Sequence, residues 1–363
     1  MRTLEELTIK GFKSIREQTL KLGKLNVFIG GNGAGKSNLV QAFRFLREIV
    51  GKNLAGYVLQ SGGADALLHF GQKRTQEMRF KLTFGEGAYG NGYELVLAPN
   101  AEDALFVKEE WTFYHDRSRF SGGTGTMIGR NSPEAKLPDD KSAVPTYVRH
   151  DLESYRVYHF HDTSSTAAVK LTGQLDDNRF LRSDAANLAA FLYFLKQKHP
   201  ETLRNIEDTV RQIAPFFEGF QLEPSRNNAE RIRLEWREKG SDAYFNASAL
   251  SDGTLRFICL ATLLMQPVLP AVVLLDEPEL GLHPAAIVLL ADLLGAAATR
   301  TQVIVATQSV GLVGQFSHED VWTVDREDGQ SVFKHLAKED LSGWLEGYSL
   351  GELWEMNRLG ARP

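Results

Sequence analysis

The segment Gly30–Ser37 reads GGNGAGKS and has the residue types and spacing of a phosphate-binding loop, G-x-x-x-x-G-K-[ST]. Glycines let backbone N–H groups curl around phosphate oxygens without obstruction by a Cβ atom. Lys36 would place its charge on the β- and γ-phosphates, and Ser37 would offer its hydroxyl to Mg²⁺. We therefore expect this loop to bind ATP with Mg²⁺ through Gly30, Gly31, Asn32, Gly33, Ala34, Gly35, Lys36 and Ser37.

The segments on both sides of this loop support that interpretation. LNVFI, at 25–29, is a short apolar run typical of a buried strand. After the loop, Leu39, Phe43, Leu46 and Val50 recur at spacings of four, three and four, which predicts one apolar face of a helix. The N-terminal dipole of that helix would add to the attraction for phosphate. The alternative, a glycine-rich turn with a chance Lys-Ser pair, does not account for these flanks.

Two carboxylates follow another apolar run, AVVLLDEPE. Asp276 stands at the carboxyl end of the predicted strand, where α/β sheets bind ligands, and is the expected Mg²⁺ ligand. Glu277, one residue on, is placed to orient or deprotonate the attacking water. The alternative is an acidic turn after a strand. This alternative is less favoured because the phosphate-binding loop is present in the same chain.

Together these motifs resemble those of the ABC-type ATPases of the RecF and structural-maintenance-of-chromosomes (SMC) kind, most closely the stand-alone bacterial ATPases related to the OLD family. Five segments carry the resemblance, in the family's order: LTIKGFKSI at 7–15, the signature-like ALSDGTLR at 249–256, DEPELGLHP at 276–284 (Walker B and D-loop), VIVATQS at 303–309, and the tail WLEGYSLGELWEMNRLG at 344–360. The resemblance implies an ATP-hydrolysing P-loop domain. It gives no role for the tail.

The resemblance also implies a homodimer that sandwiches ATP. Ser251 and Gly253 would contact the γ-phosphate held by the other subunit's loop, with a capped helix start as the alternative interpretation of SDGT. Lys13 corresponds to a basic residue near the nucleotide in related ATPases, although a solvated lysine at a strand end would look the same. Gln308 takes the place of the switch histidine, and a glutamine cannot carry the histidine's charge, which predicts slow turnover.

Two further departures from the family pattern concern acidic residues. Asp252 replaces the first glycine of the signature and would place an acid near a polyphosphate. The family's Q-loop glutamine is not obvious, because His161 and Asp162 stand where it should follow a strand. Asp162 is therefore a candidate metal ligand, and a polar turn at the strand end is the alternative.

The order of predicted elements indicates an α/β fold: an ABC-type ATPase head, 1–363, with a mainly parallel core sheet, an antiparallel β subdomain and a helical subdomain. We expect an N-terminal lobe with the loop and a β meander at 1–115. Next should come a mobile insertion rich in Gly, Ser and Pro at 116–150, and a helical and β subdomain at 151–248. The signature, Walker B, D-loop, switch strand and tail fill 249–363.

Composition limits the possible partners. Lys plus Arg is 41 and Asp plus Glu is 46, a net charge of −5, which excludes a globally basic nucleic-acid coat. Arg231, Arg233 and Arg237 form a local cationic stripe on a predicted strand, for which a solvated face is the alternative. No stretch is long and apolar enough for a membrane helix and no signal peptide is visible, so we expect a cytoplasmic protein. Cys259 lies in an apolar stretch and is expected to be a buried, inert thiol.

Three functions remain open at this point. The first is a dimeric ATP switch that controls DNA or a separately encoded effector, such as a nuclease of an anti-phage defence pair. The second is a RecF-like repair ATPase that clamps DNA. The third, a transporter ATPase, would need a separate permease. Lys36 and Asp276 are 240 residues apart, and the segment between them contains no heptad repeat, which excludes a long-armed DNA tether.

Overall fold

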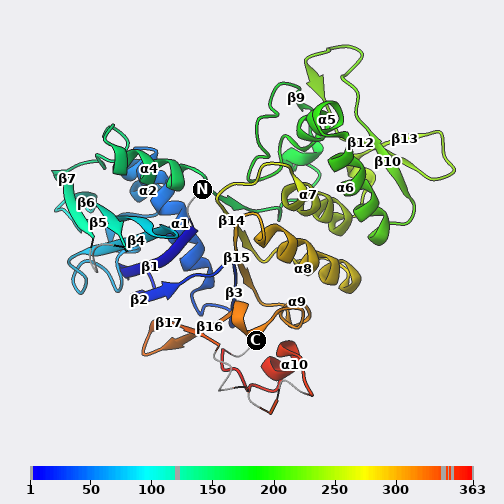
Figure 1. Cartoon of the computed structure of the whole chain (residues 1–363). Helices are drawn as coiled ribbons and strands as arrows, with labels where there is room; N and C mark the ends of the chain where they lie inside the picture. The colour runs from blue at the N-terminus through cyan, green and yellow to red at the C-terminus, as the bar shows by residue number, and fades with distance from the viewer. Residues whose placement is uncertain (1–2, 119–122, 337–340, 342, 345–346, 362–363) are drawn as a thin grey trace. The chain divides into compact units, whose positions relative to one another are not determined.

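The computed structural model describes residues 3–118, 123–336, 341, 343–344 and 347–361 (Figure 1). The chain forms two compact units. The first comprises Met1–Arg156, Pro270–Leu274 and Thr301–Pro363, and the second comprises Val157–Leu269 and Leu275–Arg300. Two of the four boundaries fall inside strands, β8 and β14, and the other two, at 269–270 and 300–301, lie between elements.

The core sheet has six strands in the order β17-β16-β3-β15-β14-β8. Their bounds are β3 (Leu25–Ile29), β8 (Tyr155–Tyr158), β14 (Val272–Asp276), β15 (Gln302–Thr307), β16 (Val321–Glu327) and β17 (Gln330–His335). The central strand β3 runs parallel to both neighbours, with Val27 opposite Val305 of β15 and Val321 of β16. Every residue of β3 and β15 is buried, as expected of strands covered on both faces. The predicted mainly parallel core sheet is confirmed.

A second six-stranded sheet is antiparallel, in the order β2-β1-β4-β5-β6-β7 (Figure 1). Its strands are β1 (Thr3–Phe12), β2 (Ile15–Lys21), β4 (Met78–Glu86), β5 (Tyr89–Pro99), β6 (Leu105–Asp116) and β7 (Thr124–Ser132). Phe12 of β1 packs against Phe45 of α1 and Phe80 of β4, with ring centroids 5.8 and 5.6 Å away. This aromatic cluster fixes the sheet to the helix that follows the phosphate-binding loop.

The segment 116–150 contains more regular structure than its composition predicted. It holds β7 and the start of α4 (Ala143–Glu153). β7 is nearly all exposed or half-buried, so it lacks the apolar alternation by which a strand is found in sequence, yet it pairs with β6 through Thr126 opposite Thr112. Pro145 lies in the first turn of α4, where its missing N–H costs nothing. The mobility of the segment stays a prediction.

The remaining helices of the first unit are α1 (Lys36–Val50), α2 (Leu54–Gln60), α3 (Ala64–Leu67), α9 (Val310–Val313), α10 (Leu350–Glu355) and the 3₁₀ turn η3 (His318–Asp320). α1 buries the predicted face, including Leu39, Phe43, Leu46 and Val50. Its first residue, Lys36, is the lysine of the phosphate-binding loop, so helix and loop are one continuous element.

The second unit is mainly helical. Its helices are α5 (Leu188–Lys198), α6 (Pro200–Ile213), α7 (Asp252–Met265) and α8 (Pro284–Ala298), with 3₁₀ turns η1 (Ala168–Lys170) and η2 (Ala247–Ala249). α7 packs against both α6 and α8. Cys259 of α7 is buried as predicted, and burial raises the pKa of its thiol to about 12. Among the helices that the structure describes, none is long and apolar enough to cross a membrane.

The second unit also has two small antiparallel sheets. One contains β10 (Phe217–Gln221), β12 (Glu235–Glu238) and β13 (Tyr244–Asn246), and the other pairs β9 (Gly173–Gln174) with β11 (Arg231–Ile232). The sequence predicted one strand over 231–237, but that run is divided between the two sheets. The alternation is nevertheless correct, because Ile232, Leu234 and Trp236 are all buried.

The arginines of the predicted cationic stripe have partners within the chain. Arg233 lies 2.6 Å from Glu235, and Arg237 lies 3.4 Å from Glu218. Arg231 donates to the carbonyl of Thr172 over 2.7 Å. The stripe therefore presents much less net charge than the spacing of its arginines predicted.

Candidate functional site

The phosphate-binding loop joins the end of β3 to the start of α1. Gly33 and Gly35 have φ angles of 78° and 119°, in the region that favours glycine. Gly30 is required for a different reason, because a Cβ atom there would lie 2.3 Å from the carbonyl oxygen of Val324. A Cβ at Gly35 would lie 2.0 Å from Oγ of Ser331. The glycines of the motif are thus set by backbone geometry and close packing.

The loop is held in place by three polar side chains. Ser331 of β17 donates its hydroxyl to the carbonyl of Ala34, and its Oγ lies 2.6 Å from Oγ of Ser14. Asn38 of α1 donates to the same Ser14 hydroxyl over 2.6 Å. The turn between β1 and β2, the loop and β17 are therefore tied together at one point. The sequence analysis did not identify Ser14 or Ser331, because nothing in a single sequence indicates a contact over 317 residues.

Lys36 is nearly buried, and its ammonium donates to the carbonyl of Gly30 and, over 3.1 Å, to that of Gly31. The side chain thus folds back across the mouth of the loop. An ammonium has three donors, so it can exchange one of these carbonyls for a phosphate oxygen without moving far. The role of Lys36 toward the β- and γ-phosphates stays a prediction.

Lys13 lies in the turn between β1 and β2, in the same unit as the loop. Its ammonium donates to Oε1 of Gln41 on α1, and burial lowers its pKa. Its backbone has a φ of 48°, and its carbonyl oxygen lies 2.7 Å from Nδ1 of His69. The residue therefore bridges α1 and the segment around His69, which is more than a solvated lysine would do.

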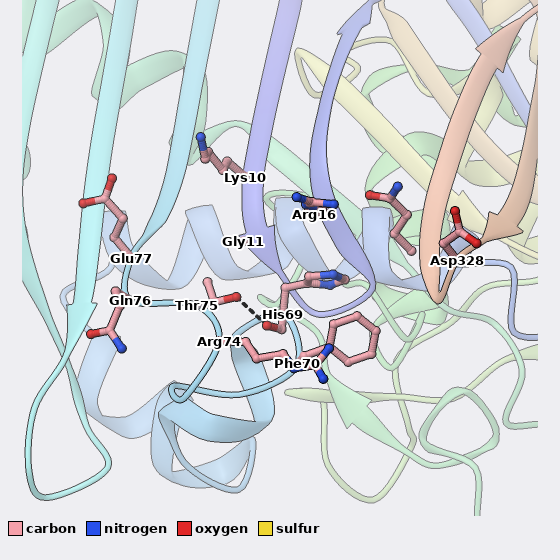
Figure 2. Close-up of a pocket in the computed structure, with 11 residues that line it drawn as sticks. Lys10, Gly11, Arg16, His69, Phe70, Arg74, Thr75, Gln76, Glu77 and Asp328 are labelled. Atoms are coloured by element: carbon pink, nitrogen blue, oxygen red, sulfur yellow. Dashed lines mark hydrogen bonds between the residues drawn. The ribbon is translucent and has the colours of Figure 1, made fainter.

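A cavity of about 620 Å³ opens beside this turn (Figure 2). Its walls come from β1 and β2, from the segment 69–77 and from the β16–β17 turn at 328–330. Figure 2 shows the rings of His69 and Phe70 beside each other, with Arg74 along Phe70. The two ring centroids are 4.3 Å apart, and the Arg74 guanidinium lies 5.4 Å from the centroid of Phe70. Phe70 is still 51% exposed, so its ring can contact a ligand.

Positive side chains slightly outnumber negative ones in this cavity, which Lys10, Arg16, Arg74, Glu77 and Asp328 line. Glu77 is bound by Lys108 over 2.8 Å, and that hydrogen bond is the main reason that its pKa is lowered. Arg16 and Arg74 form no ion pair with any residue that the structure describes. Gln330 lines this cavity, and the next residue in the sequence, Ser331, is bonded to Ala34 of the phosphate-binding loop. An aromatic ring with nearby arginines suits a planar, anionic ligand.

The signature-like segment opens α7 in the second unit. Ser251 is the N-cap residue of this helix, and its Oγ accepts from the backbone N–H of Thr254 over 3.1 Å. Gly253 lies in the first turn, where a Cβ atom would come 2.6 Å from the carbonyl oxygen of Gly281. The signature and the predicted D-loop therefore touch through two glycines. Ser251 and Gly253 are together at a helix N-terminus, as predicted.

Arg256 of α7 is a residue that the sequence analysis missed. It is 7% exposed, and its guanidinium donates to the carbonyls of Phe160 over 2.9 Å and His161 over 3.1 Å. Burial lowers its pKa. The side chain connects the signature helix to the end of β8. An arginine within the apolar run of α7 was the available indication of this role.

The carboxylate of Asp252 has a cationic neighbour, Lys170. The Lys170 ammonium lies 3.5 Å from Oδ1 of Asp252 and donates over 2.5 Å to the carbonyl of Thr163. The Lys170 side chain is only 8% exposed, whereas that of Asp252 is 66% exposed. The acid that departs from the family pattern is thus accompanied by a lysine that no motif indicates.

Asp276 ends β14, and Glu277 follows in the second unit with a left-handed φ of 47°. Such a backbone conformation is uncommon for a residue other than glycine and concentrates at functional sites. Both residues line a narrow cavity with Tyr158, His161 and Arg256. The predicted Walker B residues and the end of β8 therefore share one local environment.

Asp162 does not line that cavity. Its carboxylate is exposed and accepts from the backbone N–H of Ser164 over 3.0 Å, and hydrogen bonds from Ser164 lower its pKa. Gln308 directly follows β15 in the first unit and is half-buried. The next residue, Ser309, caps α9 by accepting from the N–H of Leu312 over 3.2 Å. The roles predicted for Asp162 and Gln308 stay predictions.

The candidate residues are divided between the two units. The first carries the phosphate-binding loop, Lys13 and Gln308, and the second carries the carboxylates and the signature. Ser37 and Asp276 offer the oxygen ligands that Mg²⁺ prefers, and Mg²⁺ is commonly held by one or two carboxylates together with substrate phosphates. Across the described part of the chain there is no cluster of three or more His, Cys, Asp or Glu that could bind a metal without a substrate.

The family described as "AAA domain, putative AbiEii toxin, Type IV TA system" matches residues 25–314. The matched range begins at β3, includes the phosphate-binding loop and the signature, and extends past the strand before Gln308. The chain belongs to this family. No curated protein matches the sequence of this AAA domain.

Solved structures similar to this AAA domain include heads of Smc proteins. An Smc head bound to the C-winged helix domain of ScpA has a TM-score of 0.60 and 19% identity, and the match covers 93% of this chain and 99% of that one. An Smc head from Pyrococcus furiosus with an extended coiled coil, bound to the C-terminal domain of ScpA, has a TM-score of 0.57 and 15% identity, over 95% and 99% of the two chains. A third, from Pyrococcus yayanosii, has a TM-score of 0.54 and 13% identity, over 93% and 98%. At these identities the likeness shows the fold, and the fold is the one predicted from the motifs.

Proposed function

We propose that this AAA domain is an ATP-dependent switch that binds Mg-ATP, dimerises around it and hydrolyses it slowly. The observation that carries the proposal is the loop between β3 and α1. Its glycines are required by backbone geometry, and its lysine lies across its mouth. Family membership supports the choice of a nucleoside triphosphate over another anion.

The base of the nucleotide would enter the cavity beside Phe70. The support for this placement is Gln330, which lines the cavity and precedes Ser331, the residue whose hydroxyl is bonded to the loop. Stacking on the exposed ring of Phe70 would stabilise the base, and Arg16 and Arg74 would favour the negative charge of the ligand. Lys13, between Gln41 and His69, would then lie alongside the bound nucleotide.

Hydrolysis is assigned to Glu277 as the group that orients or deprotonates water, with Asp276 and Ser37 as the Mg²⁺ ligands. The metal, when bound, would neutralise charge on the β- and γ-phosphates. The left-handed backbone at Glu277 supports a special role, because such conformations persist only where the surroundings hold them. Gln308 can donate to the γ-phosphate but cannot carry a charge to it, which is why we expect slow turnover.

Dimerisation would complete the site. Ser251 and the backbone of Gly253 form an N-terminal anion site on α7, which would meet the γ-phosphate held by the partner's loop. Lys170 supports this arrangement, because its charge offsets the acid at Asp252.

For the output of the switch, we propose a separately encoded effector in preference to DNA. The three arginines expected to contact a DNA backbone have partners within the chain, which weakens the RecF-like alternative. The family description includes a toxin of a toxin–antitoxin system, which suits a switch used in defence.

The direct test of nucleotide binding is calorimetry with Lys36→Ala and Mg-ATP. Removal of the charge at the loop should abolish measurable binding. Lys52→Ala is the matched control, because this exposed lysine follows the same helix and pairs with Asp139. Equal ATP affinity in Lys36→Ala and in Lys52→Ala would contradict the assignment.

A further inference from the structure

The C-terminal tail is the one motif of the sequence that the proposed function leaves unused. Its described part, 347–361, contains α10 and a turn. Ser349 and Glu352 form a capping box, in which Ser349 Oγ accepts the N–H of Glu352 over 3.3 Å and Glu352 Oε2 accepts the N–H of Ser349 over 2.8 Å. Trp354 is fully buried and donates its indole N–H to the carbonyl of Ala361. The tail is therefore a folded element with its own stabilising contacts.

One side of the tail packs against the helix that follows Gln308. α10 lies beside α9 (Figure 1). A Cβ atom at Gly351 of α10 would lie 2.5 Å from the carbonyl oxygen of Val310, the first residue of α9. Such a close approach allows only glycine at this position. α9 starts two residues after Gln308. A shift of Gln308 would therefore displace α9 and, with it, α10.

The other side of the tail faces the phosphate-binding loop. Gly31–Ala34, Arg326 and the tail residues Asn357, Gly360 and Ala361 line one cavity of about 450 Å³. Ala361 fixes this wall, because its backbone N–H donates to Oδ2 of Asp325 over 2.9 Å. That bond also occupies an oxygen of the one carboxylate that lines the cavity.

Two groups of this cavity are suited to phosphate. Arg326 is exposed at the end of β16, and no carboxylate among the described residues lies within ion-pairing distance of its guanidinium. The planar guanidinium can bind phosphate oxygens through two donors. Asn357, in a left-handed turn with a φ of 55°, brings an amide donor to the same space. The loop residues that line the cavity, Gly31–Ala34, precede the start of α1 at Lys36.

We infer that the tail forms one wall of the nucleotide site and that Arg326 and Asn357 contact the terminal phosphate of the nucleotide held by the same subunit. This inference rests on the proposed nucleotide site. Through α10 and α9, the same element joins the terminal phosphate to the residues after Gln308. The presence of a third phosphate is thereby coupled to the position of the tail.

The test is calorimetry with the Mg²⁺ complexes of ADP and of the non-hydrolysable ATP analogue AMP-PNP. Arg326→Gln and Asn357→Ala should each weaken AMP-PNP binding, by about 10-fold or more for the arginine, because charge-assisted hydrogen bonds to phosphate are lost. ADP affinity should change less than about 2-fold. Arg358→Gln is the matched control. It makes the same change in the tail, but this arginine lies over the ring of Trp344, 4.8 Å from its centroid, and does not line the cavity.

The outcomes separate this inference from the proposed function. The inference is supported if Arg326→Gln loses the preference for AMP-PNP over ADP while the affinities of Arg358→Gln stay unchanged. Equal affinities for AMP-PNP in Arg326→Gln and in the parent would overturn it, and the loop would still stand as the nucleotide site if Lys36→Ala loses binding. Equal loss of ADP and AMP-PNP would also overturn it, because the effect would then not depend on the third phosphate.

Discussion

The ammonium of Lys170 lies 3.5 Å from the carboxylate of Asp252, at the first turn of α7. The lysine is nearly buried and the acid is exposed, so the acid alone is presented to a ligand while the lysine stands behind it. This relationship changes the interpretation of the signature. An isolated acid would oppose a phosphate group, whereas a paired acid leaves the N-terminus of α7 close to neutral.

Lys170→Met is therefore expected to weaken the ATP-dependent dimer, because it exposes the phosphate to an uncompensated Asp252. Asp252→Gly should strengthen the dimer. In the Asp252→Gly background, Lys170→Met should weaken the dimer much less than it does in the parent. This dependence of one substitution on the other is the diagnostic result. Sedimentation of the four proteins with ATP measures it. Lys198→Met, which changes an exposed lysine of α5, should leave the dimer unchanged.

Phe70→Ala should weaken ATP binding by roughly 5- to 150-fold, since stacking of a base on an aromatic ring contributes about 1–3 kcal/mol. The affinity for inorganic triphosphate should be unchanged, because that ligand has no base. Calorimetry with both ligands makes the comparison, and Phe216→Ala, an exposed aromatic of the second unit, is the control. Equal losses for the two ligands would place the base elsewhere.

Two glycine substitutions should have opposite effects. Gly35→Ala should destabilise the protein by about 1–3 kcal/mol, because its φ of 119° is strained for alanine and the added methyl meets Ser331. It should also remove ATP binding. Gly295→Ala lies inside α8 with open space around the new methyl, so it should stabilise by about 0.5–1 kcal/mol. Thermal melts of the two variants provide the measurement, and a Gly35→Ala protein as stable as the parent would contradict the geometry of the loop.

The thiol of Cys259 should be inert in the native protein. Its pKa of about 12 lies well above the ordinary value for cysteine, so at pH 8 only about one molecule in 10⁴ carries the reactive thiolate. Raising the pH from 7 to 9 should therefore bring little labelling by a maleimide, and unfolding in guanidinium should bring rapid labelling. Fast labelling of the folded protein would show that the α7 core is open.

The sequence predicted the parts of the fold that depend on local pattern. The run at 25–29, the helix starting at Lys36 and the strand ending at Asp276 have strong apolar periodicity, and the loop has a motif whose residue types follow from phosphate chemistry. β7 was missed because both of its faces are largely exposed. The division of 231–237 between two sheets was missed because alternation reports burial and not the partner of a strand.

The residues that support the site could not be predicted from the sequence, for a related reason. Ser331 donates a hydrogen bond to Ala34 of the loop, 297 residues away in the sequence. Lys170 contacts Asp252, 82 residues away in the sequence. Serine and lysine are common surface residues, so their types give no indication of such roles. The tail was recognised as a motif, but only the structure shows that its residues line one cavity with Gly31–Ala34 of the loop.

The central claim is that ATP closes a dimer, and the most direct measurement is the mass of Glu277→Gln by light scattering with ATP, with ADP and without nucleotide. This variant should bind ATP and hydrolyse it at least ~100-fold more slowly than the parent, so that the closed state accumulates. We predict a dimer with ATP and a monomer in the other two conditions. Ser251→Arg in the same background should abolish the dimer and leave ATP binding by the single subunit intact. A monomer under all three conditions, or a dimer under all three, would contradict the account.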